Sequence, residues 1–249
     1  MISSNLKVGS LVVVGSGIKF ISHLTPEAKA YILESDVVLY LVNEPLLKEW
    51  ISHQNKNSES LDPIYFAYQN RQESYNAISE YILKMVRDNK HVCVVIYGHP
   101  CVYSTPGLIS AKKAKREGYY TKILPGISAE SCLFADLMIN PGDTGYQSFE
   151  ATDFLIHKKN FNPESHLILW QPDTIGLQTN INNHNNENGI KSLTTYLCKF
   201  YIPTHEIIIY EAAQYPGLEA KIYYTALNKL PVTTFSPIST LYIPPISPV

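Results

Sequence analysis

The apolar positions in the first half of the chain fall into short runs that alternate with amphipathic stretches. Runs such as SLVVVG are apolar at consecutive positions, which is typical of strands in a sheet covered on both faces. Between the runs, apolar residues recur every three or four positions, as expected for helices. The pattern predicts a largely parallel α/β sheet, with strands at 10–15, 37–42, 91–97 and 120–126 and helices at 24–36, 44–51, 71–90 and 106–118.

The second half repeats this alternation with wider spacing. A helix from Ser128 to Leu137 precedes a long irregular stretch, 140–153, and the later apolar runs predict three strands, at 166–171, 205–213 and 239–245. The Asn-rich stretch 179–189 has no apolar residues with which to form a core except Ile181, so we expect an exposed loop there, followed by a helix over 190–201. We therefore expect two α/β halves, 1–124 and 125–249, joined without a flexible linker and without an internal repeat.

Composition and charge narrow the classes of function. The 249 residues carry a formal net charge of −2 and are 45% hydrophobic, so no basic surface for nucleic acid is indicated. The apolar run near the N-terminus is too short for a membrane span. None of the four cysteines has CxxC spacing. Cys93 lies in an apolar run and Cys132 in a predicted helix, so we expect buried free thiols there, which fits a reducing, cytoplasmic setting. The histidines show no tight ligand spacing, so no metal is expected, whereas the 18 tyrosines supply many aromatic hydroxyls.

The glycine turns do not match the common nucleotide-binding motifs. The turn GSG after the first strand lacks the third glycine of a Rossmann fingerprint, and no P-loop or GxSxG motif is present. Ligands of α/β sheets bind beyond the carboxyl ends of the strands. The stretches at these ends offer small residues and backbone groups that suit a compact ligand with adenine, ribose and amino-acid parts: IYGHP, LPGISAE, LILWQP, IIIYEAA and SPIST.

In this order, the motifs resemble the tetrapyrrole methylase superfamily over essentially the whole chain. The resemblance implies two α/β domains with a cleft between them that binds S-adenosylmethionine and releases S-adenosylhomocysteine, in a homodimer. The superfamily usually has GxGPG and GDP turns. This chain has GSGIK and GHP instead, which argues against a porphyrinoid or diphthine substrate.

Residues 94–155 resemble a narrower group, the borosin peptide backbone α-N-methyltransferases. The resemblance is carried by YGHPCVYS, by KREGYYTKILPGISAESCLFADLMINPG and by YQSFEATDFL. Fungal members carry their substrate peptide fused at the C-terminus, whereas this chain ends nine residues after Thr240. It is therefore similar to the split bacterial type, which implies a separate precursor peptide as substrate and a homodimer or a heterotetramer with that precursor.

Methylation of a backbone amide requires help because the nitrogen lone pair is delocalised into the carbonyl. Donors must stabilise charge that grows on the oxygen, and a base must remove the N–H proton. Arg71 and Tyr75 are four positions apart and share a helix face. By resemblance the catalytic residues are Tyr65, Tyr68, Arg71, Tyr75 and Tyr97, with the identity of the base left open. From spacing alone, Arg71 and Tyr75 could equally form a surface pair.

The resemblance also assigns cofactor contacts. His99 would meet the carboxylate or ribose, and Tyr97 would face the sulfonium. The remaining contacts would come from Val102, Tyr103, Thr105, Ser128, Ala129, Gln171, the segment from Tyr210 to Ala212, Ser239 and Thr240. Two other functions stay open at this point. One is a small-molecule methyltransferase of the same fold, and the other is a catalytically silent binding partner.

Overall fold

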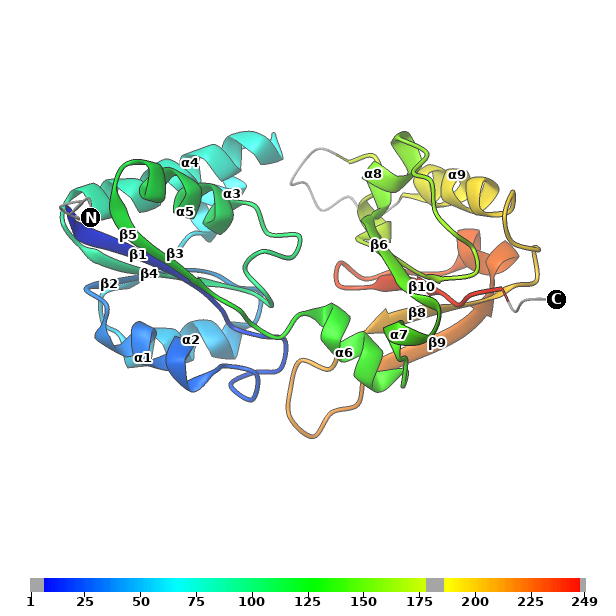
Figure 1. Ribbon diagram of the computed structural model, residues 1–249, viewed down its shortest axis with the longest axis horizontal. Coiled ribbons are helices and arrows are strands. Elements are labelled where there is room, and N and C mark those ends of the chain that lie inside the picture. The colour runs from blue at the N-terminus through cyan, green and yellow to red at the C-terminus, as the bar shows by residue number, and fades with distance from the viewer. Residues whose placement is uncertain (1–6, 178–185, 247–249) are drawn as a thin grey trace. The chain divides into compact units, whose positions relative to one another are not determined.

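The computed structural model describes residues 7–177 and 186–246, and these residues form two compact units (Figure 1). The first unit contains the described residues up to Ser131 together with Gln214–Leu218. The second contains the described residues of Cys132–Ala213 and of Glu219–Val249. The predicted domain limits, 1–124 and 125–249, remain a prediction. The two compact units differ from them in that Gln214–Leu218 belongs to the first unit.

The first unit is built on a five-stranded parallel sheet with the order β3-β2-β4-β1-β5 (Figure 1). Central strands such as β1 and β4 are rich in valine, whose branched side chains suit a strand buried on both faces. Val13 of β1 pairs with Val94 of β4, and both are fully buried. The strands are β1 (Lys7–Gly15), β2 (Val37–Leu41), β3 (Ser58–Ser60), β4 (His91–Ile96) and β5 (Tyr119–Leu124).

Helices cover both faces of this sheet (Figure 1). Ile78 and Ile82 of α4 pack with Leu11 and Val13 on one face, and Ile32 of α1 packs with Val12 and Val14 on the other. These i, i+4 apolar positions explain why the segments are helical and which side they bury. The helices are α1 (Pro26–Glu34), α2 (Pro45–Gln54), α3 (Asp62–Phe66), α4 (Arg71–Arg87) and α5 (Pro106–Arg116).

The second unit has a mixed five-stranded sheet with the order β6-β7-β10-β8-β9. Only β6 and β7 are parallel neighbours in it, and the other pairs are antiparallel. Its strands are β6 (Tyr146–Glu150), β7 (His166–Trp170), β8 (Glu206–Glu211), β9 (Lys221–Ala226) and β10 (Thr240–Ile243). Its helical segments are α7 (Pro141–Thr144), α8 (Ala151–Ile156), α9 (Glu187–Leu197) and the short 3-10 helices η1 (Pro172–Thr174) and η2 (Leu227–Val232). The boundary between the units falls within α6 (Ala129–Asp136).

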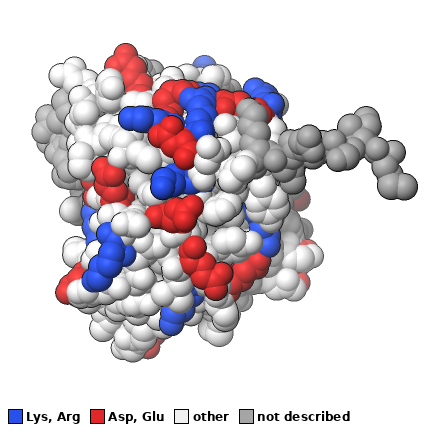
Figure 2. Space-filling model, turned by 90° about the vertical axis from the view of Figure 1, so that its left-hand side faces the viewer, with Lys and Arg blue, Asp and Glu red and all other residues white. Residues whose placement is uncertain are grey.

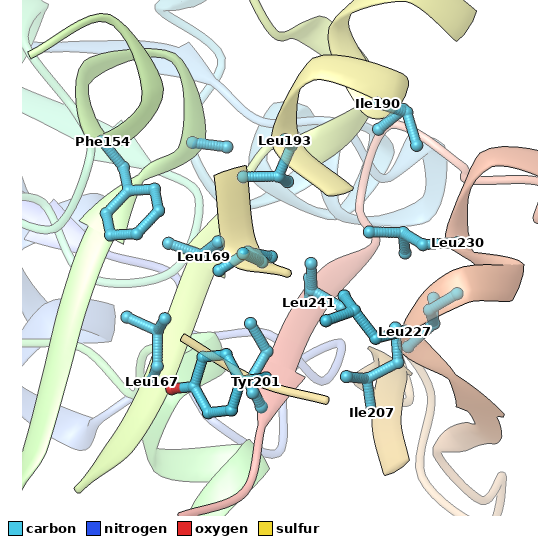
Figure 3. Packing of buried hydrophobic residues seen from close by; sticks show 14 of the residues in the cluster. Phe154, Leu167, Leu169, Ile190, Leu193, Tyr201, Ile207, Leu227, Leu230 and Leu241 are labelled. Atoms are coloured by element: carbon cyan, nitrogen blue, oxygen red, sulfur yellow. The ribbon is translucent and has the colours of Figure 1, made fainter. Parts of the chain in front are cut away.

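One continuous hydrophobic cluster joins the sheet of the second unit to α8, α9 and η2 (Figure 3). Leu167 and Leu169 of β7 point into it together with Leu241 of β10, and Leu193 of α9 and Leu230 of η2 complete it from the helices. All five side chains are fully buried, so this core fixes the sheet whose strand ends carry candidate site residues.

The α/β class and the two-sheet architecture are confirmed, and several local predictions are wrong. The largely parallel sheet predicted for the first half is confirmed, whereas strands β3, β6 and β9 lie where no strand was predicted. Residues 186–189 of the predicted Asn-rich loop belong to the start of α9, because Asn186 caps that helix by accepting a hydrogen bond from Gly189 N. The other residues of that predicted loop, 179–185, lie outside the described residues.

Charged side chains of both signs intermix on the surface (Figure 2). One such group joins α4 to α5, where Arg87 pairs with Glu117 and Glu80 pairs with Lys113 at 2.8 Å. Within residues 7–177 and 186–246, no helix is both long and apolar enough to span a bilayer. Cys93 and Cys132 are buried thiols, as predicted. The described part of the chain contains no group of three His, Cys, Asp or Glu side chains placed to hold a metal ion.

Candidate active site

Four glycines, Gly15, Gly17, Gly98 and Gly126, meet where β1, β4 and β5 end at their carboxyl edge. Gly17 and Gly98 exchange backbone hydrogen bonds of 3.1 Å, and Gly98 has a φ of +68°, which favours glycine. A Cβ on Gly15 would lie 2.3 Å from the Gly98 carbonyl oxygen, and one on Gly126 would lie 2.4 Å from the same atom. Only backbone without side chains fits here, so the three strand ends are held at one place.

The turn after β4 carries most of the candidate cofactor residues of the first unit. Tyr97 is half-buried and packs against the cluster shared with α1 and α2, and its backbone N–H donates to the Leu41 carbonyl. His99 Nδ1 accepts a hydrogen bond of 3.0 Å from Cys101 N. Since a neutral imidazole has one N–H, this contact puts the His99 proton on Nε2 and makes that nitrogen a donor.

The same turn continues into α5 with an unusual backbone. Tyr103 has a φ of +50°, a left-handed conformation that costs free energy for a residue with a Cβ, and its side chain is exposed. Val102 is half-buried, and its N–H donates to the His99 carbonyl. Thr105 precedes α5, and among the described residues its hydroxyl makes no capping hydrogen bond with that helix.

Ser128 and Ala129 follow the glycine of the third strand end. Ser128 is buried, and its hydroxyl accepts a 3.3 Å hydrogen bond from Ser131 N in the first turn of α6. Ala129 is half-buried. The first turn of α6 therefore begins directly beside the glycine junction in sequence.

Tyr65, Arg71 and Tyr75 form one cluster between α3 and the start of α4. The rings of Tyr65 and Tyr75 have centroids 6.2 Å apart, and the two side chains are hydrogen-bonded. Arg71 lies close enough to Tyr75 to act on its charge, and Arg71 Nε is a buried atom without a hydrogen-bond partner among the described residues. The Ser74 hydroxyl donates a 2.8 Å hydrogen bond to the Tyr65 carbonyl and so fixes α3 against α4.

The protonation of Tyr75 follows from this packing. Burial raises the pKa of Tyr75 to about 12, and the neighbouring Tyr65 adds to the rise, while Arg71 lowers it by a smaller amount. Tyr75 is therefore a neutral hydrogen-bond donor near pH 7. Tyr68 lies between Tyr65 and Arg71 in sequence, and its side chain is exposed.

The chain matches one protein-family description, Tetrapyrrole (Corrin/Porphyrin) Methylases, over residues 10–230. The chain belongs to this family. Solved structures agree at the level of the fold, since this methylase superposes on uroporphyrin-III-C-methyltransferase from Thermus thermophilus with a TM-score of 0.67 and 18% identity, covering 95% of this chain and 92% of that one. A diphthine synthase gives a TM-score of 0.63 at 16% identity, covering 95% and 90% of the two chains.

Fungal proteins are more similar in sequence. A methyltransferase/ribosomally synthesized cyclic peptide dendrothelin A precursor from Dendrothele bispora (strain CBS 962.96) is 37% identical over 98% of this methylase and 59% of its own length. The corresponding gymnopeptides precursor from Gymnopus fusipes is 38% identical, and the omphalotin A precursor from Omphalotus olearius is 36% identical, with the same two coverages. This methylase thus spans about three fifths of the length of these relatives.

The other candidate cofactor residues of the methylase lie in the second unit. Gln171 directly follows β7 with a φ of +56°, and its carbonyl accepts a hydrogen bond of 3.1 Å from Thr174 N. Tyr210 is fully buried in β8 and donates a 2.6 Å hydrogen bond to Asp136 Oδ2, so its side chain serves the packing of α6 on the sheet. Ala212 follows β8, and Thr240 begins β10 opposite Tyr210.

The structure thus groups the predicted residues in two sets. Tyr65, Arg71 and Tyr75 are in contact, and the turn 97–105 lies in the same unit, while five other predicted residues belong to the second unit: Gln171, Tyr210, Ala212, Ser239 and Thr240. The assignment of all of them to one site stays a prediction. Sequence reasoning missed Ser74, and it missed the contacts of the Glu211 side chain, although Glu211 lies within the predicted segment from Tyr210 to Ala212.

Proposed function

We propose that this tetrapyrrole methylase transfers a methyl group from S-adenosylmethionine to backbone amide nitrogens of a peptide. The observation that carries the proposal is the contact of Arg71, Tyr75 and Tyr65 at the start of α4. The names of the fungal relatives, which join a methyltransferase to a ribosomally synthesized peptide precursor, support a peptide as the substrate. We further propose a separate precursor chain as the substrate.

The chain's own residues suit a ligand with a carboxylate, hydroxyls and a flat base. His99 offers its Nε2–H as a donor to an acceptor oxygen, and the Thr105 hydroxyl is not used to cap α5. In the second unit, the strained backbone at Gln171 is of the kind that is concentrated at functional sites. S-adenosylmethionine, when bound, supplies an electrophilic methyl group on a sulfonium.

Arg71 and Tyr75 would act on the amide oxygen. As the N–H proton leaves, negative charge moves to the carbonyl oxygen, and donors already in place stabilise that charge without reorganising. Arg71 keeps its charge at all relevant pH values, and Tyr75 keeps its proton because its pKa is about 12. Arg71 does favour the Tyr75 phenolate, but the larger effect of burial keeps Tyr75 protonated at neutral pH.

The proton acceptor is then a different group from Tyr75. Tyr65, Tyr68 and Tyr97 remain candidates, and Tyr65 already shares a hydrogen bond with Tyr75. A base with a pKa far above the working pH is rarely in its active form, which is a further reason to assign Tyr75 the donor role.

The test is the mass of candidate precursor peptides, taken from open reading frames beside this chain's gene and from the precursor sequences of the named relatives, after incubation with this protein and S-adenosylmethionine. We expect methyl-sized increments, located on backbone amides by fragmentation. Arg71→Ala and Tyr75→Phe should each slow transfer by about a hundred- to a thousandfold, as loss of an oxyanion donor does, with little change in cofactor affinity.

Glu73→Gln is the matched control, because this exposed residue lies on α4 between the two and outside the cluster. Wild-type protein that methylates no peptide, or methylates it only on side chains, would contradict the proposal. A Tyr75→Phe variant with wild-type rates would remove Tyr75 from it. Transfer to a porphyrinoid instead would favour the small-molecule methyltransferase.

A further inference from the structure

A carboxylate that the assigned site does not use lies at the end of β8. Glu211 is the last residue of that strand, and its side chain is only 12% exposed. Its Oε1 accepts hydrogen bonds from two hydroxyls, those of Ser236 and, at 2.7 Å, Ser239. Its Oε2 accepts a 3.1 Å hydrogen bond from Lys221 Nζ of β9. One carboxylate therefore ties β8 to the turn that leads into β10.

The turn itself is closed by its two serines. Ser236 N donates 2.8 Å to Ser239 Oγ, and Ser239 N donates 3.0 Å to the Ser236 carbonyl. The Ser239 hydroxyl thus accepts from Ser236 and donates to Glu211, so it is committed to the shape of the turn. A role for Ser239 in ligand binding falls to its backbone rather than to its hydroxyl.

The position of Glu211 joins two of the predicted cofactor segments. Thr240 pairs with Tyr210 across the β8–β10 ladder, so the carboxyl end of β8 lies beside the amino end of β10. Ala212 immediately follows Glu211, and Ser239 immediately precedes Thr240. The Glu211 carboxylate therefore links the backbone segments on the two sides of this junction.

Glu211 is ionised at neutral pH. Burial alone would raise the pKa of its carboxyl, but the hydrogen bonds from Ser236, Ser239 and Lys221 together hold that pKa below its ordinary value. Because Lys221 is 82% exposed, solvent screens its ion pair with Glu211. The hydrogen bonds from the two serine hydroxyls are therefore the stronger contacts of the carboxylate.

We propose that Glu211 is a positioning residue for the cofactor: through Ser236 and Ser239 it holds the 236–240 turn against the end of β8, so that the backbone of Ala212, Ser239 and Thr240 is fixed for binding. This inference rests on the proposed function, because it takes S-adenosylmethionine as the ligand of this junction. It assigns Glu211 no contact with the reacting atoms.

The experiment is a calorimetric titration with S-adenosylhomocysteine, with KM for S-adenosylmethionine and kcat measured in parallel. Glu211→Leu removes the acceptor, and we expect affinity to fall about tenfold or more, which corresponds to about 1.4 kcal/mol. KM should rise in the same proportion while kcat at saturating cofactor stays within about twofold. Glu211→Gln keeps an acceptor oxygen for the serines, so affinity should return to within about threefold of wild type.

Two controls separate positioning from general stability. Ile207→Val removes a methyl from a fully buried residue at the other end of β8, and such changes cost about 0.5–1.5 kcal/mol of stability. It should leave affinity unchanged, and so should Lys221→Met. If Glu211→Leu binds like wild type, or if Ile207→Val weakens binding as much as Glu211→Leu, the inference is overturned. If wild type itself binds no S-adenosylhomocysteine, the proposed function fails instead.

Discussion

At the scale of the residue, Gln171 has an unfavourable backbone conformation. A residue with a Cβ in the left-handed region costs about 1–3 kcal/mol, and Gln171 takes that conformation directly after β7. Asn, Asp and Gly reach it more easily, so the glutamine side chain itself appears in the sequence for a reason other than the turn. We interpret that reason as the predicted contact with the cofactor.

Gln171→Gly separates these two effects. Because glycine adopts this φ freely, we expect the free energy of unfolding in urea to stay unchanged or to rise by less than about 1 kcal/mol. Affinity for S-adenosylhomocysteine should fall. Lys158→Gly is the matched control, since Lys158 is exposed and has a φ of +44° beyond the end of α8. It should change stability in the same direction and leave affinity alone. Unaltered affinity in Gln171→Gly would remove Gln171 from the site.

At this scale, contacts between residues close together in the sequence can be predicted, and contacts between distant residues cannot. The contact of Arg71 with Tyr75 follows from four positions on one helix face. The pKa of Tyr75 does not, because it depends on burial and on a ring brought in by α3. The hydrogen bonds of the Glu211 carboxylate could not be predicted for the same reason, as its serine partners lie 25 and 28 positions further on.

At the scale of the element, the glycine junction ties three strand ends of the first sheet together. We expect Gly15→Ala to destabilise the protein by about 1–3 kcal/mol, the usual cost of overpacking, because its Cβ would lie 2.3 Å from a carbonyl oxygen that cannot move alone. Gly118→Ala is the comparison, since a Cβ there meets no described atom within 4 Å and the cost comes only from its φ of +87°. Urea unfolding measures both.

The two variants should also differ in binding. Gly15→Ala shifts the backbone of Gly98, so affinity for S-adenosylhomocysteine should fall, whereas Gly118→Ala should bind as wild type does. Equal effects of the two substitutions on both stability and affinity would mean that the junction is not tightly packed.

Strands could be predicted from the sequence where their apolar residues reflect burial in the sheet. The strands β1, β4, β7 and β8 are nearly continuous apolar runs, and they were predicted. Strand β3 has the sequence SES, and β9 exposes Tyr223 and Tyr224 on both of its faces, so neither carries the alternation that marks a strand. Both are edge strands, whose pairing is decided by the neighbouring strand rather than by their own side chains.

At the scale of the whole molecule, we expect a homodimer. The expectation rests on the resemblance stated above and on exposed aromatic side chains, such as Phe66, Tyr223 and Tyr224, of the kind that anchor interfaces. Light scattering at micromolar concentration should give twice the mass of one chain, and addition of the precursor should give a complex with two copies of each. A monomeric mass under these conditions would contradict the dimer.

Tyrosines of both units make the stability of the protein depend on pH in alkali. The pKa values of Tyr75 and Tyr81 in the first unit and of Tyr242 in the second are raised to about 12, and burial raises the pKa of Tyr201 as well. In the unfolded chain a tyrosine titrates near pH 10. Between about pH 10 and pH 12 the folded state therefore binds more protons than the unfolded state, so the free energy of unfolding must fall as pH rises.

Below about pH 10 these phenols contribute no pH dependence, because they are protonated in both states. Urea unfolding at about pH 8 to 11 measures the slope, and the phenolate absorbance reports ionisation in the folded protein. Tyr242→Phe should flatten the slope, because burial is what raises the pKa of Tyr242. Tyr223→Phe is the control, since Tyr223 is 57% exposed on β9. A slope that is the same in wild type and in Tyr242→Phe would mean that the Tyr242 phenol ionises as readily in the folded chain as in the unfolded one.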